Sequence, residues 1–227
     1  MQDARHRASL PLVGPRGWDI PAALLACGRR LEVERGTVVT REGRPSHVWL
    51  VVKAGALRLS STNGRGCTAT FAVLGSGDLL APSSRGELLA EARAMIDSVV
   101  FRVPAPDMDG AIERDPAIGS WISLAHHRQV DLLRRRLASA LSLGVTDRLL
   151  EVLRNLASTH GAHTPDGVRI ELPLSQELLA TMVGATRESV NRAVRALEAR
   201  GAIRRTTRGY VVLTRADPQG KTGDGPG

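Results

Sequence analysis

Hydrophobic and polar positions follow one pattern in the first half of the chain and another in the second. Between Leu31 and Leu80, short runs rich in valine, leucine and threonine are separated by glycines that recur every 7 to 12 residues. This spacing is typical of short strands joined by turns. A further strand, SVVFRV, ends at Pro104. The pattern therefore predicts a β-sandwich or β-barrel.

The period changes after the sequence ERDP. Residues 117–141 form an uninterrupted stretch whose stripe positions lie three and four residues apart, which predicts one long helix. The stripe consists of Ile118, Ile122, Ala125, Gln129 and Leu132. We expect it to be the seam of a homodimer. A helix packed against its own domain would show the same stripe.

The pattern after Gly144 predicts a helix-turn-helix followed by a hairpin. An amphipathic helix covers VTDRLLEVLRNLAST, and a short strand with alternating positions runs from Val168 to Leu172. Ser175 caps a short helix, residues 183–185 make a tight turn, and Thr186 caps a helix that ends at Gly201. Two helices joined by such a turn are a helix-turn-helix, and the hairpin AIRRT–YVVLT is its wing.

The last long helix has two faces. At about 100° per residue, Val190, Ala193, Val194 and Leu197 share one face, which we expect to be buried. The opposite face carries Arg187, Glu188, Asn191, Arg192 and Arg195.

The charged face of this helix suits base edges in a DNA groove. Arginine donates two hydrogen bonds to guanine and glutamate accepts one from cytosine, so we assign base reading to Arg187, Glu188 and Arg192. Contacts to the DNA backbone are assigned to Ser175, Thr186, Asn191, Arg195, Arg204, Arg205 and Arg208. The alternative is a solvated helix face on which Glu188 pairs with Arg192 and complements the helix dipole.

Charge supports a polyanionic partner. The formal net charge is +8, and residues 186–208 hold seven arginines against two glutamates. With 42% hydrophobic and 24% charged residues, no long apolar run and no signal peptide, we expect a cytoplasmic protein without membrane contact. Cys27 and Cys67 are too few for a disulfide framework; a redox-sensitive pair is one alternative, although free cysteine is the commoner state.

The winged helix-turn-helix sequence resembles the bacterial regulators of the cyclic AMP receptor protein and fumarate and nitrate reduction (CRP/FNR) superfamily, and the similarity covers residues 31–213. It is carried by VTDRLLEVLRNLA and LPLSQELLATMVGATRESVNRAVRALEARGAI. RGTVVTREGRPSHVWLVVKAGALRLSS and VLGSGDLL are similar to the glycine layout of its cyclic-nucleotide-binding β-roll. RESVNR resembles the signature of the branch that reads TGTGA-type half-sites.

The resemblance implies an α+β fold and a homodimeric transcriptional regulator, with double-stranded DNA and, for an activator, RNA polymerase as partners. We divide the chain into flexible tails at 1–17 and 214–227, a β-roll sensor-like domain at 18–116, a dimerisation helix at 117–142 and a winged helix-turn-helix domain at 143–213.

One segment departs from the superfamily. APSSRGELLAEARAMIDS keeps a Gly-Glu-Leu turn but reaches Arg93 too soon for the short helix that nucleotide-binding members carry. By resemblance, Gly86, Glu87 and Arg93 are the candidate effector residues. The Thr-Ser pair that contacts adenine is replaced by Leu133 and Arg134. We call the segment APSSRGELLAEARAMIDS the cassette. Because it is shorter than in nucleotide-binding members, it disfavours the binding of cyclic AMP.

Two other function classes compete with an effector-controlled regulator. One is an architectural DNA-binding dimer that needs no ligand, which the short cassette favours. The other is a cupin-like metal enzyme, which needs about three histidines and a carboxylate on the strands. Apart from His6 in the tail, residues 1–125 contain only His47, so we expect neither a metal site nor an enzyme.

Overall fold

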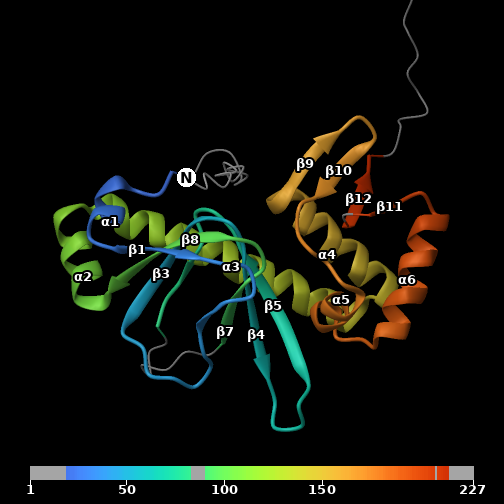
Figure 1. The fold of residues 1–227 in the computed structure, drawn as a ribbon, viewed down its shortest axis with the longest axis horizontal. Coiled ribbons are helices and arrows are strands. Elements are labelled where there is room, and N and C mark those ends of the chain that lie inside the picture. Colours follow the sequence, from blue (N-terminus) through green and yellow to red (C-terminus); the bar gives the residue numbers. More distant parts are fainter. Residues whose placement is uncertain (1–18, 83–89, 208, 215–227) are drawn as a thin grey trace, which may run out of the picture.

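The computed structural model describes residues 19–82, 90–207 and 209–214. The first part of the chain is a β-roll with a short helix at each end (Figure 1). Its elements are α1 (Ala22–Ala26), β1 (Arg29–Val33), β2 (Val38–Thr40), β3 (Val48–Ala54), β4 (Leu57–Thr62), β5 (Thr68–Leu74), β6 (Leu79–Leu80), β7 (Glu91–Ala94), β8 (Ser98–Pro104) and α2 (Ala105–Arg114).

Two four-stranded antiparallel sheets face each other in the roll. Their strand orders are β1-β8-β3-β6 and β2-β7-β4-β5. Alternate side chains of both sheets point inward and form an apolar core that includes Val52, Leu57, Leu74, Ala92 and Val100. The sequence therefore predicted the roll correctly, but not α1 or α2, which pack on the outside of sheet β1-β8-β3-β6 in a second cluster with α3.

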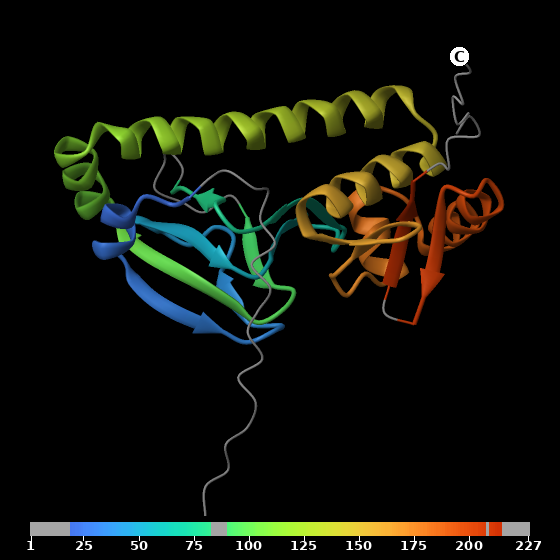
Figure 2. The same ribbon diagram turned by 90° about the horizontal axis from the view of Figure 1, so that it is seen from above.

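A single long helix connects the two halves of the molecule. It is α3 (Pro116–Ser142), whose 27 residues span about 40 Å. The side chain of Asp115 caps it by accepting a hydrogen bond from the Ala117 N–H at 3.0 Å. Figure 2 shows α3 running along the roll and on to the C-terminal part, where α4 turns back beside it.

The C-terminal part is a winged helix-turn-helix. It consists of α4 (Val145–His160), β9 (Gly161–Thr164), β10 (Gly167–Ile170), α5 (Gln176–Val183), α6 (Arg187–Ala199), β11 (Ile203–Thr206) and β12 (Gly209–Leu213). The four strands form one sheet in the order β11-β12-β10-β9. The three helices share a core with this sheet, and residues of the roll such as Val73 join the same cluster. The two halves are therefore packed against each other.

The roll covers much of the predicted dimer stripe on α3, whose role in a seam stays a prediction. Ile118, Ile122 and Ala125 are 0%, 8% and 1% exposed in the cluster that joins α3 to the roll. The Gln129 amide donates to the Leu79 carbonyl at 2.6 Å, and Leu132 packs on the roll core. Ile118, Ile122 and Ala125 are therefore covered within one chain, whereas Gln129 and Leu132 are half-buried.

A different face of α3 is free. Val130, Leu133, Leu137 and Leu141 are 42%, 46%, 62% and 81% exposed, and we call them the exposed stripe. Their three-four-four spacing was present in the sequence. Because both stripes are apolar and helical in period, only the position of the roll distinguishes them.

Candidate nucleic-acid interface

Local sequence fixes the turn between α5 and α6. The Ser175 hydroxyl accepts a hydrogen bond from the Leu178 N–H at 3.1 Å and starts α5. Gly184 ends α5 in the left-handed region, with φ 63° and ψ 51°, a conformation that glycine adopts without strain. The Thr186 hydroxyl then accepts from the Ser189 N–H at 3.2 Å and starts α6. Both cap residues, Ser175 and Thr186, are exposed to solvent.

The two faces of α6 lie as the sequence predicts. Val190, Val194 and Leu197 are 0% exposed and pack in the C-terminal core. The side chains predicted to read bases project outward instead: Arg187, Glu188 and Arg192 are all exposed, as is Arg195. The amphipathic pattern thus anchors α6 by one face and presents the other to solvent.

Glu188 carries a negative charge in the midst of these arginines. Hydrogen bonds from its own backbone N–H and from the Thr186 side chain lower the pKa of Glu188, and the charges of Arg187 and Arg192 add to this effect. The carboxylate is therefore an acceptor, while the flanking guanidinium groups are donors. Arg192 Nη2 donates to the Ser189 hydroxyl at 3.2 Å.

Asn191 differs from its neighbours. Its side chain is half-buried, and Nδ2 donates to Gln176 Oε1 at 3.0 Å, which ties α6 to the first turn of α5. The structure therefore gives Asn191 a contact within the protein; the predicted phosphate contact stays a prediction.

The wing arginines are held by exposed carboxylates. Arg204 is paired with Asp166, and Arg205 donates through Nε to Glu198 Oε1 at 3.0 Å. The Arg205 side chain lowers the pKa of Glu198 through this hydrogen bond. Ion pairs this exposed contribute little to stability, so a phosphate can replace the carboxylates as partner. Arg208 lies outside the described residues.

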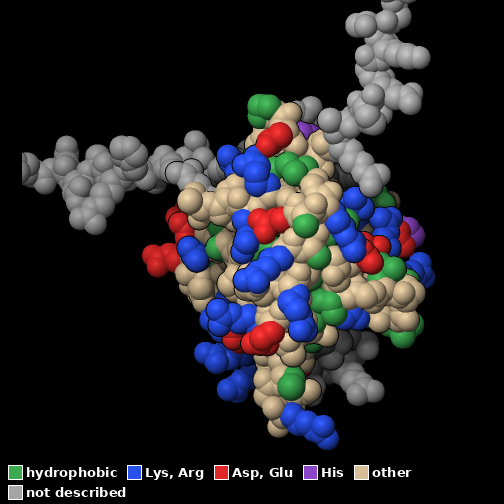
Figure 3. Space-filling view, turned by 90° about the vertical axis from the view of Figure 1, so that its right-hand side faces the viewer, with side chains coloured by type: hydrophobic (Ala, Val, Ile, Leu, Met, Phe, Trp, Pro, Cys, Tyr) green, Lys and Arg blue, Asp and Glu red, His purple; other side chains and the backbone are tan. Residues whose placement is uncertain are grey.

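The end of the molecule that carries α6 and the β11–β12 hairpin is basic. In Figure 3, which looks at this end, Lys and Arg side chains are spread over the face and outnumber acidic ones. Such a surface suits a phosphate backbone.

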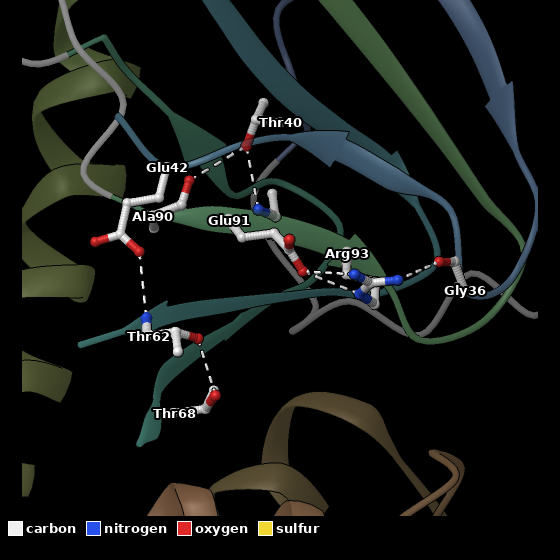
Figure 4. A network of polar contacts seen from close by, with 9 residues as sticks. Gly36, Thr40, Glu42, Thr62, Thr68, Ala90, Glu91 and Arg93 are labelled. Carbon is white, nitrogen blue, oxygen red and sulfur yellow. Dashed lines mark hydrogen bonds and ion pairs between the residues drawn. The ribbon is translucent and has the colours of Figure 1, made fainter. Parts of the chain in front are cut away.

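Of the predicted effector residues, Arg93 is the one that the structure describes, and it lies on the outer face of the roll. Ala92 and Ala94 of β7 are 0% and 2% exposed in the roll core, so Arg93 between them points to the outer face. There Arg93 pairs with Glu91 at 2.8 Å and donates to the Gly36 carbonyl at 3.0 Å (Figure 4). Arg93 thus forms a surface ion pair, and its candidate role in effector binding stays a prediction. Gly86 and Glu87 lie outside the described residues.

Among the described residues, the interior of the roll includes no buried lysine or arginine that could pair with a cyclic phosphate. The side chains described as buried in the roll are apolar apart from a few hydroxyl groups such as that of Ser60, and none of them is a cation. Buried phosphate groups in proteins are held by arginine or by several N–H donors. The residues described inside the roll therefore hold no counterpart to a phosphate.

Metal and thiol chemistry find little support in the described residues. No group of three or more His, Cys, Asp or Glu side chains is arranged there to hold a metal ion. Cys27 and Cys67 are free thiols, the first half-buried and the second exposed. Among the same residues, no helix has the length and apolar character to cross a membrane.

Two family models match the chain. The model of the Crp-like helix-turn-helix domain matches residues 147–217. The model of the cyclic nucleotide-binding domain matches residues 30–115. Together they cover the roll and the winged helix-turn-helix.

Several known proteins are similar over most of the chain. The CRP-like cAMP-activated global transcriptional regulator of Mycobacterium tuberculosis is 28% identical, over 81% of this chain and 85% of its own. The anaerobic regulatory protein of Bacillus subtilis is 21% identical, over 88% and 85%. Among solved structures, the c-di-GMP responsive regulator CLP of Xanthomonas campestris has a TM-score of 0.72 at 21% identity, over 85% and 97%.

Proposed function

The chain belongs to the CRP/FNR family of transcriptional regulators, and from this premise we propose that it binds a palindromic operator as a homodimer. Members of the family are DNA-binding regulators rather than enzymes. One observation carries the proposal: Arg187, Glu188 and Arg192 are exposed at the start of α6, while the opposite face of the helix is buried. A helix with this arrangement can enter a major groove while its buried face stays packed in the core of the domain.

The operator is TGTGA-like in each half. Arg187 and Arg192 donate to guanine O6 and N7, and Glu188 accepts from cytosine N4. Ser175, Thr186, Arg195, Arg204 and Arg205 contact phosphates and set the register. Their exposure at the same basic end of the molecule supports these roles.

The exposed stripe on α3 forms the dimer. Four aliphatic side chains in a line on a helix face, with no cover within the described chain, are suited to a two-stranded coiled coil. The two α6 helices then reach successive major grooves, about 34 Å apart. If the dimer acts as an activator, it contacts RNA polymerase at the promoter.

DNA binding does not depend on cyclic AMP. The apolar interior of the roll and the outward direction of Arg93 support this statement. The same observations favour a second candidate, a DNA-binding dimer that needs no effector and in which the roll serves dimerisation only.

Selection of bound sequences from random DNA, with and without cyclic AMP and cyclic GMP, tests the function. We expect an inverted repeat of TGTGA-like half-sites whose centres are about 10 base pairs apart, or a multiple of this spacing, and which is unchanged by either nucleotide. Recovery of no common sequence refutes the recognition helix. A repeat that appears only with a nucleotide refutes the independence from cyclic AMP and the second candidate.

A further inference from the structure

A cleft lies between the roll and the helix-turn-helix. Its volume is about 860 Å³, and it is lined by β5, the C-terminal half of α3, α4 and the end of α5. We call it the interdomain cleft. Its size lies within the range of small-molecule sites, about 300–1,000 Å³.

The lining combines aliphatic side chains with excess positive charge. Leu132, Val152, Met182 and Val183 contribute apolar surface from three helices. The charged side chains that line the cleft are Arg135, Arg136, Arg148, Arg154 and Glu151. The acidic residue is itself engaged, since the Ser139 hydroxyl donates to Glu151.

Arg136 is a half-buried arginine without a counter-charge among the described residues. Nη1 donates to the Thr70 carbonyl of β5 at 3.1 Å. Nη2 is buried and has no hydrogen-bond partner, and Arg136 forms no ion pair within the described part of the chain. Burial accordingly lowers the pKa of Arg136. A buried charged donor without a partner is unfavourable, and an anion removes that cost.

A second arginine of the lining has an unused donor. Nη1 of Arg148 donates to the Ala140 carbonyl at 3.3 Å, whereas its Nε is buried without a partner. Two guanidinium groups in one cleft therefore retain hydrogen-bonding capacity for the same type of ligand.

We propose that the interdomain cleft binds a small molecule that has an anionic group and an apolar body. The anionic group binds Arg136, with Arg148 as a further donor, and the apolar body packs on the aliphatic side chains of α3, α4 and α5. A carboxylate suits the site because its two oxygens match a guanidinium group.

The interdomain cleft borders the dimer seam, since Leu133 and Leu137 of the exposed stripe are among its lining residues. At about 100° per residue, Arg136 points about 100° away from Leu137 and from the centre of the exposed stripe. It shares its face of α3 with Leu132 and Ser139, which are directed to the roll and to α4. A partner helix on the exposed stripe therefore covers one side of the cleft, while Arg136 lies on the side that faces the roll.

A ligand in the interdomain cleft contacts both halves of the molecule. Arg136 is bonded to β5, and Met182 and Val183 belong to α5, the first helix of the helix-turn-helix. The ligand therefore stabilises the present orientation of α5 and α6 relative to the roll. Its effect on operator affinity rests on the proposed function, whereas its binding does not.

Titration calorimetry of the full-length protein with octanoate and 1-octanol tests the proposal, because the two probes share an apolar body and differ in charge. We expect octanoate to bind about ten-fold more tightly. Arg136→Met removes most of this preference and leaves 1-octanol unchanged. Glu151→Gln strengthens octanoate binding, since it removes the acidic group of the lining.

Arg134→Met is the matched control, because Arg134 is exposed on the same helix and does not line the cleft; it keeps the preference. Equal binding of both probes, a preference that survives in Arg136→Met, or no octanoate binding at millimolar concentration each overturns the site. If octanoate binds as expected but leaves affinity for the selected operator unchanged, the site stands and its coupling to DNA does not.

Discussion

The imidazole of His160, at the end of α4, lies against Gly75, which directly follows β5 of the roll. A Cβ atom at Gly75 would be 2.9 Å from His160 Nε2. The ring is 6% exposed, and Nδ1 is hydrogen-bonded to the Thr159 hydroxyl at 2.8 Å. Nearby, the hydroxyls of Thr70 and Thr181 join β5 to α5 at 2.8 Å. Polar groups therefore help to join the roll to the helix-turn-helix.

Stability should decrease as the pH falls through the range in which His160 titrates. Burial lowers the pKa of His160 to about 4, and the Leu74 carbonyl opposes this only in part. In the unfolded chain the pKa is about 6.5, so the unfolded state binds the additional proton between these values. We expect a loss of about 2 kcal/mol between pH 7 and pH 5, measured by urea unfolding.

His160→Gln should remove this part of the pH dependence, and His163→Gln, at an exposed position, should retain it. The same pH slope in the wild type and in His160→Gln would falsify the role of this side chain.

Gly75→Ala should destabilise the protein. The added methyl group would meet the His160 ring at 2.9 Å and 3.3 Å, and overpacking of this kind costs about 1–3 kcal/mol. Gly64→Ala is the matched control, because no atom lies within 4 Å of its added Cβ. Thermal unfolding measures both. If the contact is responsible, the cost shrinks in a His160→Ala background; an equal cost in both backgrounds contradicts it.

Arg187→Ala and Arg205→Ala should weaken DNA binding in different ways. Loss of the base contact costs about 1–3 kcal/mol on the selected operator and relaxes the preferred base. Loss of the phosphate contact weakens all sequences alike and reduces the salt slope by about one. Fluorescence anisotropy with operator and random DNA measures both effects.

Arg30→Ala serves as the control, because Arg30 lies on β1 and pairs with Glu32; it should bind both DNAs as the wild type does. Equal losses on operator and random DNA for both of the other variants would rule out the assigned roles.

Leu137→Glu should convert the dimer to a monomer while the chain stays folded. Leu137 is 62% exposed in the exposed stripe, so a charge there is costly only when a partner covers it. Sedimentation velocity measures the association state and circular dichroism the fold. Ser142→Glu, exposed on another face of α3, should remain dimeric. A dimer that persists in Leu137→Glu places the seam elsewhere.

Residue pattern alone predicted the architecture and the outward face of α6. An isolated amphipathic helix has one apolar side, so Val190, Val194 and Leu197 fix where Arg187 and Arg192 must point. Ser175, Gly184 and Thr186 act through neighbouring backbone, which is why their sequence signals were sufficient.

The face of α3 that meets the roll was decided by tertiary packing. Ile118 and Ile122 form one apolar stripe and Leu133 and Leu137 another, and helical period cannot rank them. Only the roll, built from strands distant in sequence, buries the first and leaves the second exposed.

The same reasoning holds for the polar residues between the two halves. His160 directly follows the predicted helix VTDRLLEVLRNLAST, and in the structure it closes α4 and lies against Gly75. Arg93 was a candidate effector residue by resemblance alone, and strand alternation with Ala92 and Ala94 directs it to the outer face. Arg136 gave no signal in the sequence, because its burial depends on β5 and α4 together. Short-range periodicity determines which side of an element is apolar, and long-range packing determines which neighbour covers it.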